Sequence, residues 1–190
     1  MNLQRYRHNQ LKELSNAVGV YALCDLDGVP IYVGQSVDGI RKRVRRHLTS
    51  ARSDVIANRQ LDVWEVAYVW AWPMPLQSPT QIRRVEYYLA NRFHSEKPLM
   101  GKIPARSLGK PRLPAKEEVR VLPPEEIEKR KDPLLRLPRQ AAHFNNLFSH
   151  ILEVKDNEEL RAALTAHFDR LYTYYNIFMK APEKSPETDS

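Results

Sequence analysis

The stretch GVYALCDLDGVPIYVGQS, residues 19–36, constrains the fold of this chain more than any other part of its sequence. Residues 17–24 and 29–35 are rich in β-branched and aromatic side chains, which are typical of strands. Between them, residues 25–28 end in an Asp-Gly pair that tolerates the positive φ angles of a tight turn. The stretch therefore predicts a two-stranded antiparallel hairpin.

Three downstream segments extend this hairpin into a domain. A helix is predicted over residues 39–52, where apolar side chains recur every fourth position, and Asp38 is its expected N-cap. A third strand is predicted over residues 63–71, whose side chains alternate between two faces. A second helix is predicted over residues 79–94, with Ser78 as its cap. The sequence thus predicts an α+β fold, a small three-stranded antiparallel sheet flanked by helices.

The rest of the chain divides by composition. Residues 1–16 form a polar N-terminal lead-in with weak helical character, and residues 17–101 hold the predicted domain. Residues 102–139 contain seven of the chain's 14 prolines and an excess of basic residues, which indicates a basic, proline-rich connector. Residues 140–180 return to helical spacing and predict a helical hairpin. The final residues 181–190 are expected to be disordered.

The overall composition bounds the functional class. The 190 residues carry a formal net charge of +7, which suits a polyanionic partner, although a merely basic soluble protein fits the charge equally well. The single cysteine, Cys24, excludes an intrachain disulfide and is expected to be a small buried apolar residue. No secretory signal and no membrane-spanning stretch is recognisable, so we expect a cytoplasmic protein.

Each arm of the predicted hairpin carries a tyrosine and a glycine, in Gly19-Val20-Tyr21 and in Tyr32-Val33-Gly34. On antiparallel arms the two tyrosines can lie side by side on one face of the sheet. Two half-buried core tyrosines would be the ordinary structural explanation of this pattern. The glycines allow backbone or substrate to approach closely.

A basic run, RKRVRRH, follows the hairpin at residues 41–47. Arg43 and His47 lie one helical turn apart, so both side chains can point to one site. A guanidinium presents a planar fork to phosphate at any working pH, and an imidazole can accept or donate a proton near neutrality. A solvated basic face explains the rest of the run better, and those residues are expected to meet a phosphate backbone: Lys42, Arg45 and Arg46.

The second helix carries Glu86 directly after Val85, at the edge of its core-facing stripe. An acid at this position is unusual in a plain structural helix. Its carboxylate could hold Mg²⁺, which takes oxygen ligands and keeps several waters. An ion pair with Arg83 is the alternative explanation.

Taken together, the two tyrosine motifs, the downstream Arg and His, and the helical Glu resemble the GIY-YIG endonuclease family over residues 17–101. The resemblance implies a general base at Tyr21, and a Tyr32 that orients the attacking water or the scissile phosphate. It implies a transition-state cation at Arg43, with Arg41 as the main rival because of the length of the preceding loop. His47 would be a proton relay or phosphate contact. Glu86 would bind the metal, Mg²⁺ or Mn²⁺.

The chain departs from the family pattern at two positions. Gln35 stands where many members have Lys, and Gly101 stands in a slot where many have Asn, for which Asn91 could substitute. These departures keep open a catalytically weak or inactive nucleic-acid-binding protein on the same fold. Contacts with nucleic acid are expected from six residues: Gly34, Gln35, Arg41, Lys42, Arg45 and Arg46.

The leading prediction is therefore a divalent-metal-dependent endonuclease that hydrolyses DNA. The aromatic residues of segment 140–180 could form a homodimer interface, or they could pack on the nuclease core.

Overall fold

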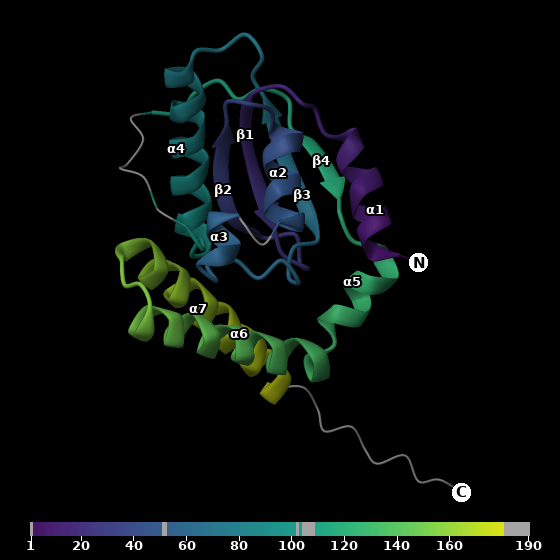
Figure 1. Cartoon of the computed structure of the whole chain (residues 1–190), viewed down its shortest axis with the longest axis vertical. Helices are drawn as coiled ribbons and strands as arrows, with labels where there is room; N and C mark the ends of the chain where they lie inside the picture. Colours follow the sequence, from purple (N-terminus) through teal and green to yellow (C-terminus); the bar gives the residue numbers. More distant parts are fainter. Residues whose placement is uncertain (1, 51–52, 102, 104–108, 181–190) are drawn as a thin grey trace, which may run out of the picture.

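The computed structural model describes residues 2–50, 53–101, 103 and 109–180 (Figure 1). Its centre is a four-stranded antiparallel sheet with the strand order β2-β1-β3-β4. The strands are β1 (Gly19–Cys24), β2 (Pro30–Ser36), β3 (Tyr68–Pro73) and β4 (Glu117–Arg120). The fold class is α+β, as the sequence predicts.

Helices surround this sheet. They are α1 (Leu3–Gln10), extended by a 3-10 turn over Leu11–Glu13, α2 (Ile40–Thr49), α3 (Asp54–Ala57), α4 (Pro79–Glu96), α5 (Pro124–Lys131), α6 (Pro133–Glu153) and α7 (Glu158–Lys180). In Figure 1, α2 lies in front of the sheet and α4 runs along the side of β2. The α6–α7 pair lies across the lower end of the sheet, so the predicted helical hairpin is confirmed.

The predicted β-hairpin forms with a register that places both tyrosines on one face. Tyr21 lies opposite Gly34, and Leu23 lies opposite Tyr32. The turn is stabilised by the buried carboxylate of Asp25, whose Oδ1 accepts the backbone N–H groups of residues 27 and 29. Gly28 adopts a φ of +76°, the conformation for which glycine was expected at this turn.

The prediction of three strands is wrong, because the sheet has a fourth. Strand β4 lies inside the segment interpreted as a connector and pairs with β3. Only Val119 of its four residues is buried, so the strand lacks the apolar alternation by which strands are recognised. The segment 102–139 is therefore largely structured where it is described, because it also contains α5 and the start of α6.

The third strand also starts later than predicted, at Tyr68 rather than residue 63. The preceding residues form a turn in which Asp62 Oδ1 accepts the backbone N–H of Trp64 at 3.1 Å. The Glu65 N–H donates to the Asp62 carbonyl at 3.1 Å. Alternating side chains continue through this turn, which is why the alternation alone placed the boundary wrongly.

Two helix starts differ from expectation and one agrees. Asp38 does not cap α2, because Gly39 occupies the N-cap position with a φ of +111° and Asp38 pairs with Lys42 instead. Helix α6 begins at Pro133 rather than residue 140, because the Asp132 side chain accepts the Leu134 N–H and proline suits the first turn. Ser78 caps α4 as predicted.

The predicted disordered tail, residues 181–190, lies outside the residues that the structure describes. Among the helices of the described part, none is long and apolar enough to cross a membrane.

The sheet buries an apolar layer on each face. On one face Tyr21, Leu23 and Val69 join a core with α2 and with the α6–α7 pair. On the other face Val20 and Trp72 join a core with α4, and Cys24 is buried in this layer as expected. The helical pair therefore completes one of the two main cores of the sheet.

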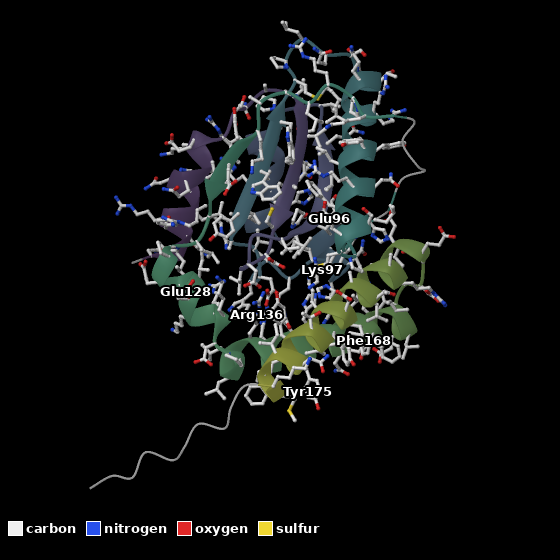
Figure 2. The ribbon with its side chains drawn as sticks, turned by 180° about the vertical axis from the view of Figure 1, so that it is seen from behind. Glu96, Lys97, Glu128, Arg136, Phe168 and Tyr175 are labelled. Atoms are coloured by element: carbon white, nitrogen blue, oxygen red, sulfur yellow. The ribbon has the colours of Figure 1, made fainter. Side chains whose placement is uncertain are left out.

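Buried ion pairs join the α6–α7 pair to the sheet. Arg136 contacts Glu65 with Nη2 and Oε2 2.9 Å apart, and both side chains are 4% exposed. The same guanidinium contacts Asp27 at 2.7 Å. Arg170 lies 3.6 Å from the Asp25 carboxylate, with both side chains almost fully buried. In Figure 2, Arg136 lies at the junction of the helical pair with the rest of the chain.

Replacing Arg136 with alanine should therefore destabilise the fold strongly. Burial raises the pKa of Glu65, and without Arg136 the ionised carboxylate would be left in a poor environment. Breaking a buried pair of this kind costs roughly 3–5 kcal/mol of the free energy of unfolding, which urea titration measures. The matched control is Arg161→Ala, which breaks a solvent-exposed pair with Asp156 and should change stability little. Equal effects of the two substitutions would contradict the role of the buried pair.

Candidate active site

The tyrosine pair forms the floor of the candidate site. Tyr21, on β1, is fully buried, whereas Tyr32, on the edge strand β2, is partly buried. Their ring centroids are 6.3 Å apart, as the side-by-side prediction requires. A Cβ on Gly34 would lie 2.7 Å from Tyr21 Oη and 3.0 Å from Tyr32 Cε1. The absence of a side chain at Gly34 therefore leaves space for the Tyr21 hydroxyl. Gly34 is itself buried, and its contact with nucleic acid stays a prediction.

His47 connects the basic helix to this floor. Its Nε2 atom lies 2.7 Å from Tyr21 Oη, and its Nδ1 atom lies 2.6 Å from Ser53 Oγ. The imidazole is 2% exposed, so both hydrogen bonds are shielded from water. The sequence indicated His47, but Ser53 was not identified, because nothing in the local pattern distinguishes it from an ordinary loop serine.

Arg43, one helical turn before His47, is the guanidinium at the tyrosine pair. Burial raises the pKa of Tyr21 well above its usual value, the neighbouring Tyr32 raises it further, and the charge and hydrogen bond of Arg43 oppose both. Burial also raises the pKa of Tyr32, again opposed by Arg43. The rival Arg41 lies elsewhere, since its Nε and Nη2 donate to the Leu14 carbonyl at 2.8 and 2.6 Å.

Glu86 lies on α4, which packs against β2, and its charge acts on Tyr32. The carboxylate is partly buried and accepts the backbone N–H of Gln35. Burial raises the pKa of Glu86, and the Gln35 hydrogen bond and the charge of Arg83 oppose the shift. The Glu86 charge in turn contributes to the raised pKa of Tyr32, after the larger effects of burial and Arg43. Tyr32 therefore lies within the electrostatic reach of both Arg43 and Glu86.

The remaining predicted residues lie around this centre. Arg45 and Arg46 are exposed on α2, and Lys42 is exposed in its pair with Asp38. Gly101 lies against Tyr32, since a Cβ there would be 3.2 Å from Cδ2.

The substitution of Asn91 for the expected Asn stays a prediction. The Asn91 amide Nδ2 donates to the Tyr87 carbonyl within α4 at 2.8 Å.

The donor set fits a metal held by one protein ligand. Within the described residues, no group of three or more His, Cys, Asp or Glu side chains gathers in a way that could hold an ion. Glu86 is a single carboxylate near the tyrosine pair. Mg²⁺ suits such a site, because it keeps several waters and is often bound by one or two carboxylates together with substrate phosphates.

Arg43, His47 and Glu86 are thus arranged around two tyrosines at the edge of an α+β sheet. Residues 17–98 match the family model of the GIY-YIG catalytic domain, and this segment is therefore a GIY-YIG catalytic domain, a domain of nuclease type. The match covers fewer than half of the 190 residues and ends at the close of α4 and its following turn. Neither the curated proteins nor the solved structures that were compared give a match.

The close packing around Gly34 predicts that a larger residue at this position destabilises the fold. Gly34→Ala should push the Tyr21 ring away from His47 and lower the free energy of unfolding by about 1–3 kcal/mol, as overpacking does. The cost should shrink when the same substitution is made in a Tyr21→Phe background, because the nearest atom, Tyr21 Oη, is then gone. Denaturant titration of the four proteins measures this double-mutant cycle. An equal cost in both backgrounds would show that the glycine does not accommodate the hydroxyl.

Proposed function

We propose that this chain is a divalent-metal-dependent endonuclease that hydrolyses DNA phosphodiester bonds. The observation that carries the proposal is that the charges of Arg43 and Glu86 both act on Tyr32, whose ring lies 6.3 Å from Tyr21 and 5.7 Å from His47, the two residues joined by a buried hydrogen bond. Tyr32, Arg43 and Glu86 are partly exposed and can meet the phosphate. Tyr21 and His47 are buried and can take a proton from the attacking water.

The proton path follows from the buried hydrogen bond. The pKa of Tyr21 is raised by burial, so a free phenolate would be costly. Tyr21 therefore acts as base only while its own proton passes to His47 Nε2, 2.7 Å away. A water gives a proton to Tyr21 Oη, its oxygen bonds to phosphorus, the bond to the leaving oxygen breaks, and that oxygen takes a proton from solvent. Tyr32 orients the water or the phosphate.

Charge at the phosphate is balanced by Arg43 and by the metal. Arg43 stays protonated at working pH and offers a planar fork to the phosphorane oxygens. Glu86 would hold Mg²⁺ or Mn²⁺, and the ion supplies Lewis-acid stabilisation of phosphate oxygens. The backbone N–H of Gln35 orients the Glu86 carboxylate, and this contact is independent of the missing lysine side chain at that position.

DNA is the partner that the charge distribution favours. Arg45, Arg46 and Lys42 project from α2, the helix that carries Arg43, so a phosphate backbone can follow them to the site. Gln35 and Arg41 are further proposed contacts. The net charge of +7 supports a polyanionic partner.

A binding protein without catalysis is the second candidate. The observation in its favour is the complete burial of Tyr21, which keeps the proposed base away from bulk water in this conformation. We also propose that residues 17–101 form the nuclease domain that carries the catalytic residues, and that the α6–α7 pair can bind a second copy. Exposed aromatic side chains support a docking role for this pair: Phe148, Phe168, Tyr172, Tyr175 and Phe178.

Cleavage assays on plasmid and single-stranded DNA separate the two candidates. Arg43→Ala should lower kcat by about 10²–10³, the loss typical of removing one transition-state donor. Glu86→Gln keeps an acceptor for the Gln35 N–H but weakens metal binding, so its activity should fall and rise again with added Mg²⁺. The matched control is Glu96→Gln, an exposed acid at the end of the same helix, which should cleave normally. Equal cutting by all four proteins, or none by wild type, would contradict the nuclease proposal.

The α2 arginines should determine how DNA binding depends on salt. Each arginine that neutralises a phosphate adds about 0.9 to the slope of log K against log salt concentration. Arg45→Ala and Arg46→Ala together should therefore reduce that slope by roughly 2 without changing sequence preference. Arg161→Ala, on the far helical pair, is the control and should leave the slope unchanged. The measurement is fluorescence anisotropy at several salt concentrations, and an unaltered slope in the double variant would refute this binding surface.

A further inference from the structure

We propose that Ser53 is a positioning residue that holds His47 in the tautomer able to accept the proton of Tyr21. The inference rests on the proposed function, because it assigns the residue that makes the proton path possible. It concerns a residue outside the set of tyrosines, arginine, histidine and glutamate described above.

The first step is geometric. The two ring nitrogens of His47 face two different hydroxyls, Tyr21 Oη at 2.7 Å and Ser53 Oγ at 2.6 Å. All three residues are buried, with exposures of 0%, 2% and 2% for Tyr21, His47 and Ser53. Bulk water therefore does not compete with Tyr21 and Ser53 for the two ring nitrogens of His47.

The second step concerns the tautomer. A neutral imidazole has one N–H and one lone pair, and the hydrogen bond at one nitrogen determines the state of the other. His47 can take a proton from Tyr21 only if Nε2 carries the lone pair. Nδ1 must then carry the hydrogen, and Ser53 Oγ must accept it. The opposite tautomer would donate from Nε2 to the tyrosine oxygen, so His47 could not accept the Tyr21 proton.

The third step is the rigidity of the Ser53 backbone. Its N–H donates to the Ser50 carbonyl at 3.1 Å, just after α2. Its carbonyl accepts the N–H groups of Ile56 and Ala57 at 2.9 and 2.8 Å, at the start of α3. Ser53 is thus attached to both helices, and its hydroxyl is held beside the imidazole.

The proton balance of the relay is simple. When Tyr21 transfers its proton to Nε2, His47 becomes an imidazolium whose Nδ1–H still donates to Ser53 Oγ. Ser53 keeps its own proton throughout. A neutral hydroxyl stabilises the imidazolium less than a carboxylate would, so once the phosphate bond is broken Nε2 can return its proton to Tyr21 Oη while Tyr21 releases to solvent the proton it took from water, which balances the proton taken up by the leaving oxygen.

Nitrogen-15 NMR of the histidine rings in the full chain tests the tautomer without any need for activity. Signals of His47 are assigned by their loss in His47→Gln. The wild type should show the Nδ1–H form, Ser53→Ala should shift the ring toward the Nε2–H form, and Ser53→Thr should retain the wild-type pattern. An Nε2–H ring in the wild type, or the same tautomer in wild type and Ser53→Ala, overturns the proposal.

Cleavage kinetics give the second readout. Ser53→Ala should lower kcat by about 10–100-fold, a loss of the size found when the partner that orients a metal-binding histidine is removed, with KM nearly unchanged. Ser53→Thr should restore most of kcat, and Ser95→Ala, an exposed serine of α4, should match wild type. A wild type that cuts no DNA contradicts the nuclease proposal, and the NMR comparison still decides the role of Ser53.

Discussion

The hydrogen bond between Tyr21 and His47 is the interaction on which the rest of the site depends. It joins an inner strand of the sheet, β1, to the basic helix, and both side chains are buried. Because Tyr21 lies opposite Gly34, a Cβ at that position would come 2.7 Å from Tyr21 Oη, so a side chain there would have to displace the hydroxyl that makes the bond. The glycine on the edge strand thus leaves the Tyr21 hydroxyl free to meet the imidazole that α2 brings to it.

Much of this centre could be predicted from the sequence because it is local. The Asp-Gly turn, the apolar spacing of α2 and the position of Glu86 on a helix each depend on a few neighbouring residues. Strand β4 was missed because its stability comes from pairing with β3, while only Val119 is buried. Ser53 was missed for a related reason, since its role arises from a contact with His47 that no sequence pattern marks.

The same limit applies to the C-terminal half. Helical spacing predicted two helices, but the residues that attach them to the sheet are charged and would ordinarily be assigned to the surface. Arg136 and Arg170 are instead buried against carboxylates of the β1–β2 turn and of the loop before β3. The sequence shows these residues only as charged side chains. Their pairing could not be predicted, because the partners lie far apart along the chain and meet only in the completed fold.

Because of this attachment, the tyrosine site depends on residues beyond the segment that matches the family model. The family match ends at residue 98, yet the core around Tyr21 includes Leu147, Ile151 and Leu160 from the helical pair. Burial raises the pKa of Tyr32, and the charge of Arg43 opposes this shift. The charges of Glu86 and of Glu159 on α7 raise the same pKa further. The helical pair therefore supplies both core and charge to the site. A chain cut after the matched segment would lose part of the environment that sets the proton affinity of its tyrosines.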